Sequence, residues 1–372
     1  MKINFAILAP GKIAEKMAEA VTAIAEGQIF AAAPEGAELV KYAVASRDLK
    51  RAEGFAERWG FEKAYGSYEA LALDPEVDLV YVASPHAFHY AHARLCLEHG
   101  KHVLLEKAFT LNEADSEKLI GLAREKGLLL AEAIWTRYMP ARRILDEVIG
   151  SGIIGPVTAL TANLHYAMEG KQRLTDLTLG AGALLDVGVY PINFALMAIH
   201  EEIRETASLV SMSKAGYDQE ETVSLLFESG RLATLHSGMR SISDRKGFIY
   251  GKKGYIEVEN INNPEKITVY DLDRRVILTP ALPPQVNGYE YEVLACMEAI
   301  RDGQCECPQM PHDETLRVMR LCDSLRRQWG MVYPGEKEMG KEEFCKEAFC
   351  REEIGSEAAA GEDLCRKEGA SL

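Results

Sequence analysis

Two short motifs, far apart in the sequence, could supply acid and base groups to one reaction centre. The first is Leu105-Glu106-Lys107-Ala108, at the end of an apolar run typical of a buried strand. A lysine at the mouth of a parallel sheet can hydrogen-bond a substrate hydroxyl and stabilise developing alkoxide charge. The alternative interpretation is an ordinary surface ion pair between Lys107 and Glu106.

The second motif lies in the apolar stretch Gly180-Ala181-Gly182-Ala183-Leu184-Leu185-Asp186-Val187-Gly188-Val189-Tyr190-Pro191-Ile192-Asn193. If a helix begins near Leu184, then Asp186, Tyr190 and Asn193 are spaced i, i+4 and i+7 and share one face. Three polar groups on one face of an apolar helix call for a reason. They could line a cleft that faces Lys107, or they could form a satisfied polar cluster buried between two domains.

A third segment, Ala9-Pro10-Gly11-Lys12-Ile13-Ala14, lies between the first expected strand and the first expected helix. A dinucleotide-binding fold places G-x-G-x-x-G/A at this point. Gly11 would let the backbone approach a diphosphate, and the free N–H groups of the helix start would hold the anion. Ala9 stands where the first glycine is expected, which weakens the match. We predict that the cofactor contacts Ala9, Pro10, Gly11, Lys12 and Ile13.

The end of the second expected strand bears on the choice of cofactor. An acidic residue that would grip the ribose 2′-hydroxyl of NAD is absent there, and Ser46 and Arg47 stand in its place. A hydroxyl and a guanidinium suit the 2′-phosphate of NADP. We therefore predict NADP as the preferred cofactor, with NAD as the alternative. The competing interpretation is a solvated helix cap formed by Ser46 or Asp48.

Further cofactor contacts are expected at the ends of the next two strands, because open α/β sheets bind ligands at the carboxyl ends of their strands. The positions are Ser84, Pro85, His86, His89, Glu106 and Lys107. His86, His89 and His92 cannot bring three imidazoles to one face of a single helix. We therefore predict no metal site.

Strand-like and helix-like periods alternate over the first part of the chain. Apolar runs at 3–9, 39–45, 77–83, 102–105 and 128–133 are separated by helical patterns. This alternation predicts βαβ units and a parallel sheet. After Pro140, consecutive strand patterns joined by turn signals predict an open, mainly antiparallel sheet. The predicted fold is α/β, with a dinucleotide-binding Rossmann domain at 1–134, a substrate-binding α+β domain at 135–333, and an acidic tail at 334–372.

Composition excludes several function classes. The 372 residues carry a net charge of −15, which argues against binding to a phosphate backbone. The longest uncharged apolar stretch, Val187–Ile199, is too short to span a bilayer. The eight cysteines are scattered through a large chain, as expected of reduced thiols in a cytoplasmic protein.

Taken together, the segments APGKIA, ASRD, SPHAFH, GKHVLLEKAFTLN, EAIWTRYMPA and GAGALLDVGVYPI resemble the glucose–fructose oxidoreductase / inositol dehydrogenase / rhizopine catabolism (Gfo/Idh/MocA) family. The resemblance spans about residues 3–330. It is greatest to the branch of dihydrodiol dehydrogenases and D-xylose 1-dehydrogenases. The usual Glu-Lys-Pro of the family is Glu106-Lys107-Ala108 here, a departure that leaves the lysine intact.

This resemblance implies an NAD(P)-dependent dehydrogenase that moves hydride between the nicotinamide and a carbinol of a sugar, sugar derivative or cyclic diol. It places the catalytic pair on Lys107 and Tyr190 and the family aspartate on Asp186. We expect Tyr190 to act as general base, with its pKa lowered by the Lys107 ammonium. Further substrate contacts are expected from four side chains, namely Trp135, Arg137, His165 and Asn193.

The resemblance also implies that the second sheet forms the face of a homodimer or higher homo-oligomer. The rival hypothesis is a non-catalytic NAD(P)-binding sensor or scaffold, because a fold does not fix a function. A protein that has lost the catalytic activity of its family tends to lose the acid–base groups as well, and both Lys107 and Tyr190 are present here.

Overall fold

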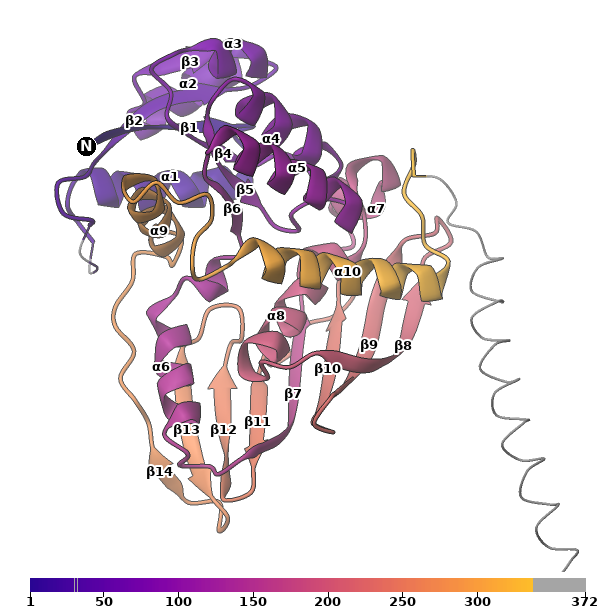
Figure 1. Cartoon of the computed structure of the whole chain (residues 1–372). Helices are drawn as coiled ribbons and strands as arrows, with labels where there is room; N and C mark the ends of the chain where they lie inside the picture. Colours follow the sequence, from indigo (N-terminus) through magenta and orange to yellow (C-terminus); the bar gives the residue numbers. More distant parts are fainter. Residues whose placement is uncertain (30, 32, 337–372) are drawn as a thin grey trace, which may run out of the picture. The chain divides into compact units, whose positions relative to one another are not determined.

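The computed structural model describes residues 1–29, 31 and 33–336. Within it, Met1–Tyr333 forms one compact unit built on two sheets (Figure 1). The predicted acidic tail at 334–372, which carries three of the cysteines, lies almost entirely outside the described residues.

The first sheet has six parallel strands in the order β3-β2-β1-β4-β5-β6. Its strand order reverses between β1 and β4, so the carboxyl ends of these strands open a crevice suited to a dinucleotide. The strands are β1 (Lys2–Leu8), β2 (Glu38–Ala45), β3 (Lys63–Tyr65), β4 (Leu79–Val82), β5 (His102–Glu106) and β6 (Leu130–Ala133).

Helices connect these strands, as the alternating periods predict. They are α1 (Lys12–Ala25), α2 (Leu49–Trp59), α3 (Tyr68–Leu73), the short 3₁₀ turn η1 (His86–Phe88), α4 (His89–Glu98) and α5 (Glu113–Lys126). The sequence patterns did not reveal β3 or α3, because segments of three and six residues are too short to show a period.

The second sheet has eight strands in the order β14-β13-β12-β11-β7-β10-β9-β8. All neighbours are antiparallel except β7 and β10, which run parallel. The strands are β7 (Val157–His165), β8 (Ile203–Met212), β9 (Asp218–Phe227), β10 (Leu232–Gly238), β11 (Gly247–Gly251), β12 (Gly254–Glu259), β13 (Lys266–Asp271) and β14 (Val276–Leu278). The predicted fold class, a parallel Rossmann sheet followed by an open and mainly antiparallel sheet, is confirmed.

The remaining helical elements join the two sheets. They are η2 (Trp135–Arg137), α6 (Pro140–Gly150), α7 (Gln172–Thr175), η3 (Leu177–Leu179), η4 (Leu184–Gly188), α8 (Val189–Ala198), α9 (Glu290–Arg301) and α10 (His312–Trp329). Late in the chain, α9 returns to pack on α1, and α10 packs on α5 (Figure 1). The last two helices of the compact unit are therefore held against helices of the first domain.

The apolar segment after Gly182 is wholly buried, but it is not the uniform α-helix that its spacing predicts. Leu184–Gly188 forms one π-helical turn, and the α-helix begins only at Val189. A π turn widens the helix and changes which side chains share a face. Among the described residues, the stretch Leu177–Ala198 has the length and apolar composition of a membrane span, and its most apolar window is entirely buried inside the protein.

Candidate active site

A cavity of about 850 Å³ opens where the carboxyl edge of the first sheet meets η4 and α8. This volume lies within the range of cofactor and ligand sites in proteins. The cavity brings together sixteen of the residues expected in the site: Ala9, Pro10, Gly11, Lys12, Ile13, Ser46, Arg47, Ser84, Pro85, His86, His89, Glu106, Lys107, Trp135, Asp186 and Tyr190.

The turn between β1 and α1 fits a diphosphate. Gly11 is the N-cap of α1 and has no side chain to occupy the first N–H groups of the helix. Those groups and the helix dipole favour an anion. A side chain added at Gly11 would enter open space, 4.0 Å from the nearest atom, which is the carbonyl oxygen of Ala9.

Ala9 holds the backbone conformation for which glycine is suited. Its φ is +70°, in the left-handed region. Its N–H donates to the Ala45 carbonyl at 3.0 Å, and its own carbonyl accepts from the Gly11 N–H at 2.8 Å. The alanine therefore preserves the tight turn of the dinucleotide motif, with the steric penalty that a Cβ carries at positive φ.

The far end of the cavity carries two arginines. Arg47 and Arg51 both line it, and Arg51 donates to the Pro10 carbonyl at 2.8 Å, which ties α2 to the diphosphate turn. Asp48 is the N-cap of α2 and accepts from the Lys50 N–H at 3.0 Å. The helix cap that the competing interpretation assigned to Ser46 or Asp48 is therefore present, and Arg47 lines the cavity beside it.

The two cavity histidines connect backbone segments through contacts of their ring nitrogens with carbonyl groups. His89 is fully buried and its ring nitrogens lie 2.8 Å from the carbonyls of Ser84 and Ala108, which follow β4 and β5. The Nδ1 of His86 lies 3.2 Å from the Gly180 carbonyl, which belongs to the second domain. Burial lowers the pKa of His86 to about 3, so this ring is neutral near pH 7; burial also lowers the pKa of His89 to about 4, although the two carbonyls beside its nitrogens act in the opposite direction.

Lys107 and Asp186 meet at the centre of the cavity. The Lys107 ammonium donates to the Asp186 carbonyl at 2.6 Å and to its carboxylate at 3.2 Å. Arg173 donates to both carboxylate oxygens, at 2.7 and 3.2 Å. Burial alone would raise the pKa of Asp186, but the charges of Lys107 and Arg173 outweigh it and hold this pKa well below its usual range. The carboxylate is therefore ionised, and it fixes both cations.

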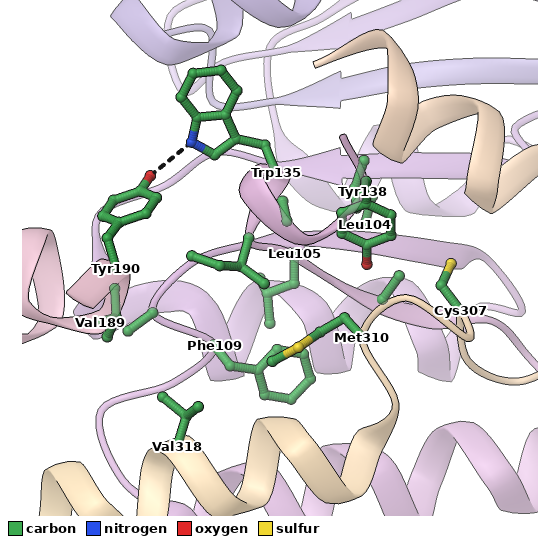
Figure 2. Packing of buried hydrophobic residues seen from close by; sticks show 14 of the residues in the cluster. Leu104, Leu105, Phe109, Trp135, Tyr138, Val189, Tyr190, Cys307, Met310 and Val318 are labelled. Atoms are coloured by element: carbon green, nitrogen blue, oxygen red, sulfur yellow. Dashed lines mark hydrogen bonds between the residues drawn. The ribbon is translucent and has the colours of Figure 1, made fainter. Parts of the chain in front are cut away.

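Tyr190 lies beside this pair, on α8. The Trp135 indole donates to the Tyr190 hydroxyl at 3.0 Å (Figure 2). The Lys107 ammonium lies over the Tyr190 ring, 5.2 Å from its centroid. Tyr289 stacks on Trp135 with a centroid distance of 4.5 Å and closes that side of the cavity.

The pKa of Tyr190 differs from the expectation that Lys107 lowers it. Burial is the largest cause, and the neighbouring Tyr289 and Glu106 side chains act in the same direction, so this pKa lies well above its usual value. The physical reason is orientation: the Lys107 ammonium faces the tyrosine ring and is engaged by Asp186. Tyr190 is therefore a neutral phenol near pH 7.

Three expected substrate contacts lie outside the cavity lining. The Arg137 guanidinium is buried and donates to the Asn193 amide oxygen at 2.6 Å and to Glu314 at 2.8 Å. Asn193 donates in turn to the Val189 carbonyl at 2.7 Å. His165 is buried against His236 and bonds Ser241 at 3.0 Å. Arg137 and Asn193 bind each other, whereas the Nε2 of His165 has no partner among the described residues; none of the three lines the cavity.

Several residues of the cavity escaped the sequence reasoning because they lie in segments without a period or motif. These are Arg51, Tyr68, Tyr166, Met168, Lys171, Gln172, Arg173, Leu179, Asn262 and Tyr289. The only signal for Arg173 was a basic residue in the polar stretch that precedes the Gly180 motif, and a charge in a loop is normally a solvated one.

A buried carboxyl holds the start of the segment that carries Asp186 and Tyr190. Asp218 is fully buried and accepts from the Leu184 N–H at 2.6 Å. Gly182, with a φ of +122°, lets it come this close, because an added Cβ would lie only 2.1 Å from an Asp218 oxygen. Burial raises the pKa of Asp218 to about 6. Asp218 is thus a positioning residue for the two polar side chains of the site.

Comparison with known proteins gives matches over most of the chain. Residues 3–133 match the model of the oxidoreductase family with an NAD-binding Rossmann fold, and residues 143–257 match the GFO/IDH/MocA C-terminal domain. The trans-1,2-dihydrobenzene-1,2-diol dehydrogenase of Mus musculus is 32% identical over 79% of this chain and 90% of its own length. The D-xylose 1-dehydrogenase (NADP(+)) of Hypocrea jecorina is 32% identical over 89% of this chain and 93% of its own.

Solved structures show the same fold. The crystal structure of KijD10, a 3-ketoreductase from Actinomadura kijaniata in complex with NADP and TDP-benzene, is similar with a TM-score of 0.77 and 26% identity. The similarity covers 88% of this chain and 98% of that one.

Proposed function

The chain belongs to the Gfo/Idh/MocA family of NAD(P)-dependent oxidoreductases, and from that premise we propose that it transfers hydride between the nicotinamide of NADP and a carbinol carbon of a sugar, sugar derivative or cyclic diol. The observation that carries the proposal is the convergence of Lys107, Asp186 and Tyr190 on one cavity that also contains the Gly11 turn. Acid–base groups and an anion-binding helix start are the two parts that such a reaction needs.

When bound, the cofactor supplies the hydride acceptor or donor. Its diphosphate would be held by the N–H groups at the start of α1 and by Lys12. Its 2′-phosphate would be held by Arg47 and Arg51 beyond the end of β2. The relatives named for NADP or solved with it agree with this choice without deciding it for this chain.

Lys107 and Tyr190 are proposed to share the substrate oxygen. The Lys107 ammonium is held by Asp186 and keeps donors for one more acceptor, because an ammonium has three N–H groups. It would stabilise the negative charge that develops on the oxygen. Asp186 contributes by fixing the ammonium, and Arg173 by holding the carboxylate ionised.

Tyr190 is proposed to carry the proton. As a neutral phenol it can give its proton to a carbonyl oxygen in the reducing direction. In the oxidising direction the phenolate must accept a proton from the carbinol, so oxidation should depend steeply on pH. The Trp135 indole, which donates to the Tyr190 oxygen at 3.0 Å, would stabilise that phenolate.

The walls of the cavity suit a polyhydroxylated substrate. The stacked pair of Trp135 and Tyr289 offers a flat apolar surface to the C–H face of a ring. Tyr166 and Asn262, which hydrogen-bond each other, offer polar groups at the rim of the same cavity. A few polar groups in a largely apolar pocket are the usual means of orienting a small ligand.

The second sheet is proposed to form a homodimer through its uncovered face. On this sheet the aromatic rings of Phe248, Tyr250, Tyr255 and Tyr270 lie next to one another in a row, with Phe248 stacked on Tyr250, Tyr255 stacked on Tyr270, and Tyr250 tilted against Tyr255. Leu209 and Leu232 are 80% and 49% exposed on its other strands. An apolar exposed patch of this kind is typical of an interaction surface. Light scattering on the protein as it elutes from a size-exclusion column should give twice the chain mass. A monomer at all protein concentrations would overturn this assignment.

The function is tested by following reduced-nicotinamide absorbance with NADP or NAD and a panel of aldoses, inositols and cyclic diols. Turnover with one class is the expected result, and it also reports the cofactor preference. Cofactor binding without turnover on any class would favour the sensor hypothesis. Absence of both would contradict the proposal itself.

A further inference from the structure

The cavity is strongly cationic although the chain carries a net charge of −15. Its lining holds six lysines or arginines (Lys12, Arg47, Arg51, Lys107, Lys171 and Arg173) against three acids (Asp48, Glu106 and Asp186). Lys107 and Arg173 are engaged by Asp186, and Arg51 by the Pro10 carbonyl. Lys171, an exposed residue of the second domain, has no carboxylate or carbonyl partner of this kind among the described residues.

Lys171 stands on a segment that is fixed at both ends. We call residues 166–180 the bridging segment. At its start, the Tyr166 N–H donates to the Gly238 carbonyl at 3.2 Å and the Met168 N–H to the Met239 carbonyl at 2.8 Å. At its end, Gly180 packs against the first domain. Its φ is +82°, and an added Cβ would lie 2.7 Å from the Cβ of His86. The segment therefore spans the cavity from one domain to the other.

The ammonium of Lys171 has a poor internal partner. It donates to the Met168 sulfur at 3.0 Å, and within the part of the chain that the structure describes no carboxylate lies within ion-pair distance of it. Partial burial first, and then the positive charge of Arg173, lower the pKa of this ammonium; Asp186 raises it, and Lys12 lowers it again. Lys171 and Lys12 are thus close enough to influence each other, and neighbouring cations of this kind favour an anion between them.

Lys12 lies on the other side of this site. It is the first residue of α1, directly after the Gly11 N-cap, where the helix start already favours an anion. Both lysines line the same cavity. We propose that Lys171 is a second ligand of the cofactor diphosphate, supplied across the domain boundary opposite Lys12.

This inference rests on the proposed function, since it concerns the cofactor of that site. Arg173 lies two residues beyond Lys171 on the same segment and holds Asp186. Binding of the diphosphate would therefore fix the segment that holds the Lys107–Asp186 pair. An acidic group on the substrate is the competing ligand for Lys171.

The test is titration of the full chain with three probes in the absence of substrate: NADP, ADP-ribose 2′-phosphate, and adenosine 2′-monophosphate, which lacks the diphosphate. K171M should weaken the first two about tenfold, the loss of one charge-assisted contact, and leave the third unchanged. K171R should recover most of the affinity. The matched control is K214M, which removes an exposed lysine outside the cavity lining and should bind all three probes normally.

A double-mutant cycle sharpens the assignment. If Lys12 and Lys171 hold the same diphosphate, the losses in K12M and K171M should not add in the double variant. Unchanged NADP affinity in K171M, with a raised KM for substrate at saturating cofactor, would overturn the inference in favour of a substrate anion. Equal weakening of all three probes would also overturn it. A wild-type chain that binds none of them would instead overturn the proposed function, and this inference with it.

Discussion

The Lys107 ammonium hydrogen-bonds two parts of Asp186 at once, the backbone carbonyl at 2.6 Å and the carboxylate at 3.2 Å. The contact joins the end of β5 in the first sheet to the π turn η4 in the second domain. Because the lysine engages a backbone group as well as a side chain, its position depends on how η4 is held. Asp218 and Arg173, which act on the same turn, therefore bear on the reaction without contacting substrate.

Tyr190 should control how the reaction depends on pH. Its raised pKa means that the phenolate fraction is small at neutral pH and grows about tenfold per pH unit. The rate of carbinol oxidation at saturating substrate should therefore rise with pH between about 7 and 9, whereas carbonyl reduction, which uses the neutral phenol, should stay flat.

Steady-state rates in both directions across this range provide the measurement. Y190F should lose most of the activity in both directions while it binds NADP normally. A flat oxidation profile in the wild type, or normal turnover in Y190F, would contradict the role given to Tyr190.

Arg173 should act through Asp186. Replacement by methionine leaves a buried carboxylate with Lys107 as its remaining cationic partner and shifts the ammonium toward it. We expect kcat to fall about 10- to 100-fold with a smaller change in KM, because orientation of the ammonium is lost and the pocket walls remain. R173K, which keeps the charge, should recover part of the rate. If R173M raised only the KM, a direct substrate contact would be the better explanation.

Much of this site could be predicted from the sequence because its central residues follow strand ends. Gly11, Ser84 and Lys107 lie within three residues of the ends of β1, β4 and β5, and parallel strands bring their carboxyl ends to one edge. The register of the antiparallel sheet and the path of the bridging segment depend on tertiary packing. Arg173 and Lys171 therefore carried no local signal.

The helix face that Asp186, Tyr190 and Asn193 were predicted to share shows a second limit of prediction from the sequence. The spacing assumes 3.6 residues per turn, but the segment between Asp186 and Tyr190 includes the π turn at Leu184–Gly188, whereas Tyr190 and Asn193 both lie in the regular helix α8. Asp186 and Tyr190 reach the cavity, whereas Asn193 is bonded to Arg137. The hydrogen bonds that hold these side chains are long-range: Asp218, more than thirty residues later, accepts from the Leu184 N–H, and Arg137 binds Asn193.

Arg47 should discriminate between the two cofactors. Loss of its guanidinium removes a charge-assisted contact to the 2′-phosphate, which NAD lacks. R47A should weaken NADP by about tenfold or more and leave NAD nearly unchanged. Titration of both cofactors measures this, with Arg143→Ala on the exposed side of α6 as the control. Equal losses for the two cofactors would place the 2′-phosphate elsewhere.

Replacement of Ala9 by glycine should cost less stability than the same replacement of an alanine with a negative φ. At a φ of +70° the methyl group carries a steric penalty of about 1 kcal/mol, which glycine removes. A9G should therefore be neutral or stabilising by about 0.5 kcal/mol, whereas A64G, in the extended strand β3, should destabilise by about 1 kcal/mol. Denaturant unfolding of both variants decides it, and similar destabilisation in both would contradict the strain assigned to Ala9.

Glu132 should make the protein less stable as the pH rises. It is buried at the end of β6, where it accepts from the Thr315 hydroxyl at 2.8 Å, and burial raises its pKa from 4.5 to about 7. A carboxyl whose pKa is raised on folding binds its proton more tightly in the folded state. Its contribution is therefore full below pH 4.5 and is lost as the pH rises through about 7. The difference corresponds to about 3 kcal/mol.

E132Q cannot ionise and keeps the oxygen that accepts from Thr315. The free energy of unfolding of the wild type should fall between pH 5 and pH 8 relative to that of E132Q, and the difference between the two proteins should level off above pH 8. Parallel urea titrations at each pH supply both curves. Glu117→Gln, on the exposed side of α5, is the matched control and should leave the slope of the wild type unaltered. If E132Q and the wild type lose stability in parallel, the pH dependence belongs to other buried carboxyls, of which Asp218 is the first to test.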